Sequence, residues 1–187
     1  MWADVASIVV KAGIIIILGY IAISDFNTQK IRNRHLVFLL MGSLALCAIR
    51  LWAGETMWSV LQEAAVAAGL FLVLFVFWMF GKLGAGDVKL LVIVPLIVGI
   101  DGSMTFAVGL LVFTSIIYML TKFPILVPQR WFKTYLLGLG KTGRIPFGVP
   151  ISLAAVVALL VPIAISYAPN SVRNEQMTTL DFNALGR

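Results

Sequence analysis

The stretch from residue 5 to residue 24 reads VASIVVKAGIIIILGYIAIS and carries a single charge, at Lys11. About 20 apolar residues of helix, each rising about 1.5 Å, are enough to cross the hydrocarbon core of a bilayer, which is roughly 30 Å thick. The stretch therefore predicts a transmembrane helix. No basic segment precedes it, which argues against a cleaved signal peptide and favours a helix that is retained.

The composition extends this expectation to the whole chain. Of 187 residues, 61% are hydrophobic and only 12% are charged, whereas a soluble domain carries about 25% charged residues. We expect an all-α, polytopic membrane helix bundle of about six transmembrane helices, forming one membrane domain over residues 1–167, with a polar tail at 168–187. The expected spans are Val5–Ser24, Leu36–Trp52, Val60–Gly81, Asp87–Ile100, Ser103–Thr121 and Phe147–Tyr167. The fourth is short, and Pro95 predicts a kink in it.

The distribution of charge predicts the orientation. With the N-terminus outside, the inner segments hold ten of the 14 basic residues, namely Lys30, Arg32, Arg34, Lys82, Lys89, Lys122, Arg130, Lys133, Lys141 and Arg144. Lys and Arg concentrate on the cytoplasmic loops of membrane proteins. The net charge of +6 is thus explained by topology, and no nucleic-acid partner is expected. The longest inner loop, residues 122–146, is basic and aromatic, and it is expected to lie along the membrane surface.

Two carboxylates stand apart from the other acidic residues. Asp25 follows the first apolar stretch, and Asp87 lies in the sequence GAGDVK, residues 84–89. In the predicted topology they are the only acids on the basic face. Taken singly, Asp25 could simply end a helix and Asp87 could be an N-cap, the residue whose side chain satisfies free N–H groups at a helix start. As a pair near a membrane they indicate a functional site.

Two carboxylates held close together can catalyse hydrolysis. Like charges at short range do not both ionise readily, so one carboxyl group keeps a proton. The ionised group can then activate water, while the protonated group polarises a carbonyl. Two other functions use the same residues: a small ion- or proton-coupled carrier, and a non-catalytic scaffold of a secretion machine. Carriers usually place acids near the bilayer midplane and show repeated halves, and neither feature is present here.

At these residues the chain resembles the type IV prepilin peptidases, which are GxGD aspartyl membrane proteases. The resemblance lies in Asp25 upstream of a basic loop ending in Asn33, in the sequence GAGDVKL at residues 84–90, and in IPFGVP at residues 145–150. It covers roughly residues 5 to 167. The chain departs from the family pattern in two places, at Arg32, where the family often has Pro, and at Val149, which separates Gly148 from Pro150.

The resemblance implies a specific activity. Asp25 and Asp87 would be catalytic, and Gly84, Gly86, Lys89, Lys30, Asn33, Pro146 and Gly148 would bind substrate or support the site. The substrate would be a prepilin or pseudopilin with a short basic leader, cut at the cytoplasmic face of the bacterial inner membrane, and the pilus assembly machinery is a further possible partner. No metal or cofactor is implied. The one cysteine, Cys47, and the lack of an inserted domain place the chain nearest the short Flp/Tad-type subgroup, without methyltransferase activity.

Two further features are weaker. The sequence GLGKTG at residues 138–143 resembles a phosphate-binding loop, but Tyr135 occupies the position of the first glycine, so a surface loop is expected. His35 is the only histidine, and it cannot form a His-based metal site alone.

Overall fold

A computed structural model describes residues 2–81, 83–122 and 147–167, and every regular element in these ranges is an α-helix. The helices are α1 (Trp2–Thr28), α2 (Asn33–Trp52), α3 (Met57–Met79), α4 (Ala85–Lys122) and α6 (Gly148–Tyr167). The prediction of an all-helical protein is confirmed for these ranges. The expected inner loop and the expected tail lie almost entirely outside the described residues.

Four of these helices are long and apolar enough to cross a membrane: α1, α2, α3 and the Ala85–Leu120 part of α4. In α6 the apolar stretch Gly148–Val161 is shorter. Large apolar side chains such as Ile16, Leu72 and Leu111 are exposed along the helices. In a membrane such side chains contact the apolar lipid tails, so they can be exposed on the protein surface without cost. The chain is therefore a multi-pass membrane protein, although helix length and hydropathy alone support four spans rather than six.

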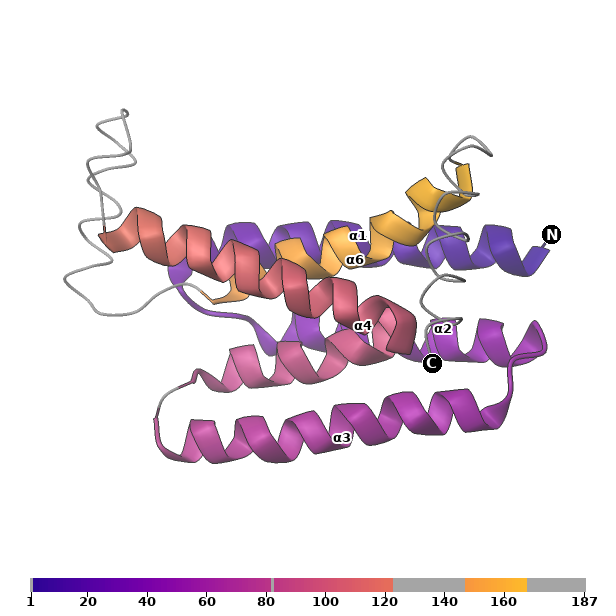
Figure 1. Cartoon of the computed structure of the whole chain (residues 1–187), viewed down its shortest axis with the longest axis horizontal. Helices are drawn as coiled ribbons and strands as arrows, with labels where there is room; N and C mark the ends of the chain where they lie inside the picture. The colour runs from indigo at the N-terminus through magenta and orange to yellow at the C-terminus, as the bar shows by residue number, and fades with distance from the viewer. Residues whose placement is uncertain (1, 82, 123–146, 168–187) are drawn as a thin grey trace, which may run out of the picture.

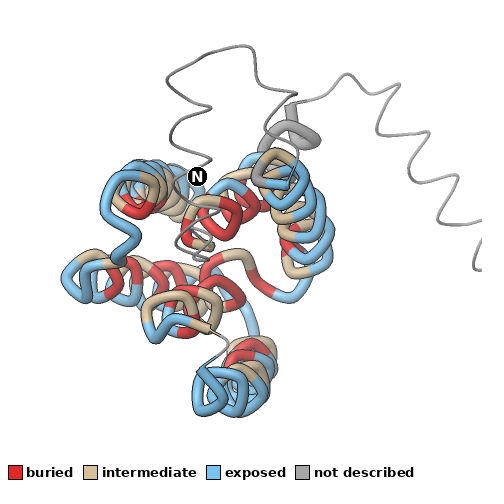
Figure 2. Tube along the Cα trace, turned by 90° about the vertical axis from the view of Figure 1, so that its left-hand side faces the viewer, coloured by how far each residue is buried: buried red, intermediate tan, exposed pale blue. Residues whose placement is uncertain are grey.

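The helices pack along one another in a single bundle (Figure 1). α4 packs against α6, α3 and α2, while α1 packs against α2 and α6. The buried faces turn toward the middle of the bundle and the exposed faces turn outward (Figure 2). Leu18 of α1, Leu39 of α2, Leu90 and Val94 of α4 and Ala154 of α6 are fully buried and belong to one hydrophobic core. Close packing of this kind stabilises helix bundles in lipid.

α4 is broken at Gly99, where φ is 73° and ψ is 178°. The break lies four residues after Pro95, so the expectation of a kink at the proline is wrong in its position. Only glycine adopts such dihedrals readily, and the hydroxyl of Ser103 donates to the carbonyl of Gly99 at 2.6 Å. After the break the helix turns back along the bundle (Figure 1). The sequence placed two separate helices here, at Asp87–Ile100 and Ser103–Thr121, and the structure joins them at this break.

Helix α1 runs further than the sequence predicted, to Thr28 instead of Ser24. It ends where Gln29 takes a left-handed conformation with φ of 52°. Asp25 therefore does not end the helix but lies inside its last turn. From there its side chain is directed into the bundle, where it is only 4% exposed.

Candidate active site

Asp25 is held by the start of a helix that is remote in sequence. The backbone N–H of Gly148, the first residue of α6, donates a hydrogen bond of 2.8 Å to Oδ2 of Asp25. The N–H of Val149 is directed to the same carboxylate. The first N–H groups of a helix have no partner within the helix and carry partial positive charge. They therefore fix this carboxylate and satisfy it in a buried place.

Gly148 leaves no room for a side chain. A Cβ atom there would lie 2.7 Å from Oδ2 of Asp25, 2.8 Å from its Cγ and 3.0 Å from its Cβ. Contacts this short force atoms to move. The glycine of the IPFGVP motif is thus required by the close approach of the α6 backbone to Asp25.

Asp87 lies in the first turn of α4, as its third residue, and not at the N-cap position. Gly84 is the residue immediately before α4, and its backbone N–H is directed to the carboxylate of Asp87. This is the acid's half of a capping box, in which a side chain at the third helical position reaches the N-cap N–H. A Cβ atom on Gly84 would lie 2.8 Å from Oδ2 of Asp87, so this glycine also makes room for a carboxylate.

The two carboxylates lie at the same end of the bundle. The last turn of α1 and the first turns of α2, α4 and α6 all meet there (Figure 1). Asp25 is buried and Asp87 is half-buried, and they are near enough for the charge of Asp25 to act directly on Asp87. Elements far apart in the sequence thus bring together the two acids that the pattern singled out.

Two further contacts join the segments that carry the acids. Nζ of Lys89 donates to Oδ1 of Asn33 at 3.1 Å, which links the second turn of α4 to the start of α2. Beside it, a Cβ atom on Gly86 would lie 3.0 Å from Cβ of Ile31. The loop after α1 and the first turn of α4 therefore pack with almost no space between them.

The comparison with protein families matches the type IV leader peptidase family over residues 12–121. The match covers more than half of the chain and includes both acids. The chain belongs to this family. It is therefore an aspartic-type prepilin peptidase, and the carrier and scaffold alternatives lose their support. No match was found among curated proteins or among solved structures.

One segment of the candidate site lies outside the range that matches the family. Gly148 and the rest of α6 follow residue 121, yet α6 supplies the hydrogen bond that holds Asp25. The resemblance of the IPFGVP motif pointed to this segment, but nothing in the sequence indicated which atom it would contact. Ile31, which lies against Gly86, was not identified from the sequence, because an isolated loop isoleucine carries no signal of its own.

The remaining expected residues contribute less to this geometry. Lys30 is exposed in the loop after α1, where its carbonyl lies 3.4 Å from the Thr28 hydroxyl. Pro146 and the sequence GLGKTG lie outside the described residues. His35 stacks at a tilt on Tyr20, with ring centroids 4.8 Å apart. In the described part of the peptidase, no three His, Cys, Asp or Glu residues come together as a metal site would require.

Proposed function

We propose that the peptidase cleaves with Asp25 and Asp87 as a water-activating pair. The observation that carries this proposal is the meeting of the two acids at one end of the bundle, each beside a glycine that has no room for a Cβ atom. Both acids also fall within the range that matches the family.

The reaction follows from the chemistry of two carboxyl groups that share one proton. The ionised group takes a proton from water as the water oxygen attacks the scissile carbonyl carbon. The protonated group donates its proton to the carbonyl oxygen. The tetrahedral intermediate is then a diol. When it collapses, the C–N bond breaks, the carboxyl group that took the proton from water gives it to the leaving amine, and the other carboxylate takes a proton from a diol hydroxyl as the product C=O forms. The pair ends with one proton, as it began, and titrates as a unit.

The position of the pair fits a substrate that is itself anchored in the membrane. Both acids lie within one turn of a helix end, so a peptide bond beside the first turn of a substrate helix could reach them. We propose a prepilin of the Flp type as the substrate. The support is the short link of residues 29–32 between α1 and α2 and the single cysteine, since the larger family members carry a domain with paired cysteines between these two helices.

We also propose six membrane spans, with the N-terminus outside and the acids at the cytoplasmic face of the inner membrane. Residues Ala85–Leu120 form 36 residues of apolar helix, which would measure about 54 Å if straight. A bilayer core is roughly 30 Å thick. The break at Gly99 divides this length into residues 85–98, about 21 Å and shorter than the core, and residues 100–120, about 32 Å. Each part would cross once, and α6 would supply the sixth span. The basic residues of the predicted inner segments support the orientation.

The test is co-expression with an Flp-type prepilin, with cleavage read as a gel mobility shift. We expect the wild type to cleave, and Asp25→Asn and Asp87→Asn each to abolish cleavage. Asp101→Asn is the matched control, because Asp101 is an exposed acid in the second half of α4. It should cleave as the wild type does.

Each outcome has a distinct meaning. Cleavage that survives either dyad substitution, in correctly inserted protein, excludes the pair as the catalytic group. If the wild type cleaves a prepilin with a long pilin domain but not an Flp-type prepilin, the proposed substrate class is wrong while the dyad stands. Mapping the cut to the outer side of the membrane excludes the proposed orientation.

A further inference from the structure

A second polar site lies at the end of the bundle opposite the two acids. A cavity of about 280 Å³ opens there between the start of α1, the end of α2 and the break in α4. We call it the distal pocket, and it is lined by Ala3, Asp4, Ser7, Lys11, Leu46, Ile49, Arg50, Ala53, Glu55, Ile97 and Val98. Its size is close to the lower limit of small-molecule sites, about 300 Å³.

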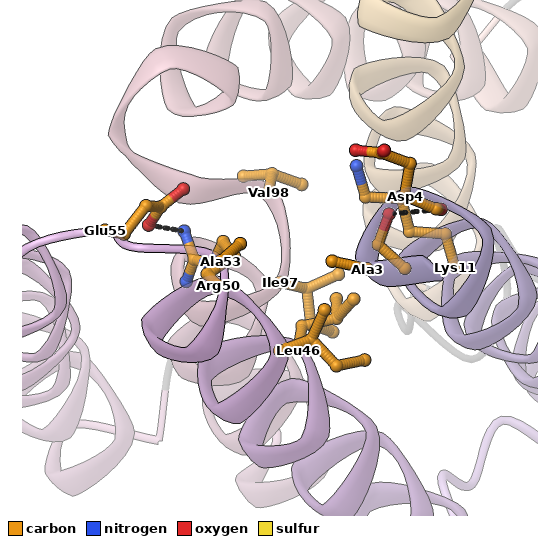
Figure 3. A pocket seen from close by; sticks show the side chains of 11 residues that line it. Ala3, Asp4, Lys11, Leu46, Arg50, Ala53, Glu55, Ile97 and Val98 are labelled. Atoms are coloured by element: carbon orange, nitrogen blue, oxygen red, sulfur yellow. Dashed lines mark hydrogen bonds and ion pairs between the residues drawn. The ribbon is translucent and has the colours of Figure 1, made fainter. Parts of the chain in front are cut away.

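The distal pocket contains cationic donors for which the described part of the chain offers no partner. Lys11 extends from the apolar part of α1 into the pocket (Figure 3). It makes no hydrogen bond or ion pair with any residue that the structure describes. Arg50 binds Glu63 through both terminal nitrogens, at 2.6 and 2.5 Å, yet its buried Nε has no partner among the described residues. A cation within a membrane helix is costly, and it marks a functional site by default.

Two exposed carboxylates, Asp4 and Glu55, also line the distal pocket (Figure 3). Glu55 lies in the turn between α2 and α3, 3.8 Å from Arg50, and its side chain is 44% exposed. Arg50 reaches inward to Glu63, which lies six residues beyond the start of α3, about 9 Å along the helix. The side chains of the free donors are therefore less exposed than that of Glu55: Arg50 is 24% exposed and Lys11 is half-buried, whereas Glu55 is 44% exposed.

This order of charges matches one kind of ligand. A phospholipid at a membrane surface places its phosphate next to the acyl chains and its amine further out. We propose that the distal pocket binds the phosphoethanolamine headgroup of a membrane phospholipid. Lys11 and Nε of Arg50 donate to the phosphate, and Glu55 accepts from the primary ammonium. Leu46, Ile49 and Ile97 supply the apolar wall beside the glycerol and the first acyl carbons.

The chemistry of the pocket distinguishes this headgroup from two others. A phosphatidylglycerol headgroup lacks the amine and would bring its net negative charge against Glu55. A choline headgroup has the positive charge but no N–H to donate to a carboxylate. Phosphatidylethanolamine alone of the three satisfies both the less exposed donors and the exposed acceptor.

The experiment is native mass spectrometry of the whole detergent-purified protein. It is titrated in turn with phosphatidylethanolamine, phosphatidylglycerol and phosphatidylcholine of identical acyl chains. The wild type should retain phosphatidylethanolamine most strongly. Lys11→Gln should weaken that binding about tenfold, as the loss of one charged hydrogen bond implies. Glu55→Gln should abolish the preference over phosphatidylglycerol by weakening only the ethanolamine lipid.

Lys122→Gln is the matched control, because it makes the same change at the opposite end of the bundle, and it should bind as the wild type does. Unfolding temperatures in detergent show that each variant is folded. Equal binding of the three lipids, or an unchanged Lys11→Gln variant, overturns the proposal. Displacement of the lipid by an equal concentration of soluble glycerophosphoethanolamine overturns the lipid assignment, and indicates a site for a soluble zwitterion.

Discussion

The backbone N–H of Gly148 donates a 2.8 Å hydrogen bond to Oδ2 of Asp25, across 123 residues of sequence. The bond places the start of the last described helix directly on a carboxylate that is buried at the end of the first. It depends on an approach that no residue other than glycine permits. The orientation of Asp25 is therefore set by α6 as much as by α1.

Gly148→Ala should inactivate the peptidase without unfolding it. The added Cβ atom would lie within 3.0 Å of three atoms of Asp25, so the carboxylate and the start of α6 must separate. A displacement of about 1 Å in a catalytic group costs on the order of 100-fold in rate. Leader cleavage under single-turnover conditions measures the loss.

Gly19→Ala on α1 is the control for Gly148→Ala. A Cβ atom at Gly19 meets nothing within 4 Å, so this variant should cleave at the wild-type rate. A Gly148→Ala enzyme that cleaves within twofold of the wild type contradicts the positioning of Asp25 by α6.

Gly84→Ala should also slow cleavage, but by less. Its Cβ atom would lie 2.8 Å from Oδ2 of Asp87 and 3.6 Å from Cγ. Only the end of the side chain is obstructed, and a carboxylate can rotate away from the contact. We expect a loss of about tenfold, again in single-turnover cleavage. A larger loss than that of Gly148→Ala would show that Asp87 is the more rigidly held of the two acids.

The sequence was sufficient to identify the acids but not their surroundings. The apolar stretches and the GAGD motif predicted both the helical membrane fold and the candidate pair. They could not show that Asp87 is the third residue of its helix and not the N-cap, since a helix could start at any of the three residues before it. The predicted boundary between two spans, at residues 100–103, lies next to the break at Gly99, but the kink was assigned to Pro95, because proline is the stronger breaker by itself. The contacts around Gly99 in the folded bundle, with Glu63 and Arg50, are not visible in a local pattern.

The Lys89–Asn33 bond should contribute little to catalysis. It spans 3.1 Å between exposed side chains, and exposed polar pairs stabilise by about 0.2–1 kcal/mol. Asn33→Ala and Lys89→Ala should each lower kcat/KM by less than about fivefold. The kcat/KM of the double variant should be no lower than that of the less active single variant, since both changes remove the same contact. Additive losses in this double-mutant cycle would mean that each residue contacts substrate separately.

The Arg50–Glu63 pair should stabilise the fold without taking part in cleavage. Glu63 is 4% exposed, and both of its oxygens bind Arg50. Its Oε1 would also lie 3.1 Å from a Cβ atom on Gly99, so the pair fits against the break in α4. Glu63→Leu leaves the Arg50 charge partly buried without its partner. Breaking a buried pair in this way costs about 3 kcal/mol, measured by denaturant unfolding in detergent.

Replacing both Arg50 and Glu63 shows whether the stability lost in Glu63→Leu comes from the missing ion pair or from the unpaired charge of Arg50. Arg50→Leu combined with Glu63→Leu should recover much of the stability lost in Glu63→Leu alone, since no unpaired charge then remains.

Glu55→Gln is the control, because Glu55 is 44% exposed and lies 3.8 Å from Arg50. It should change the free energy of unfolding by less than about 0.5 kcal/mol. All three variants should cleave within about twofold of the wild type below their unfolding temperatures, because the pair lies at the opposite end of the bundle from Asp25. A double variant less stable than Glu63→Leu would mean that the ion pair itself, and not the removal of an isolated charge, holds the break at Gly99 in place.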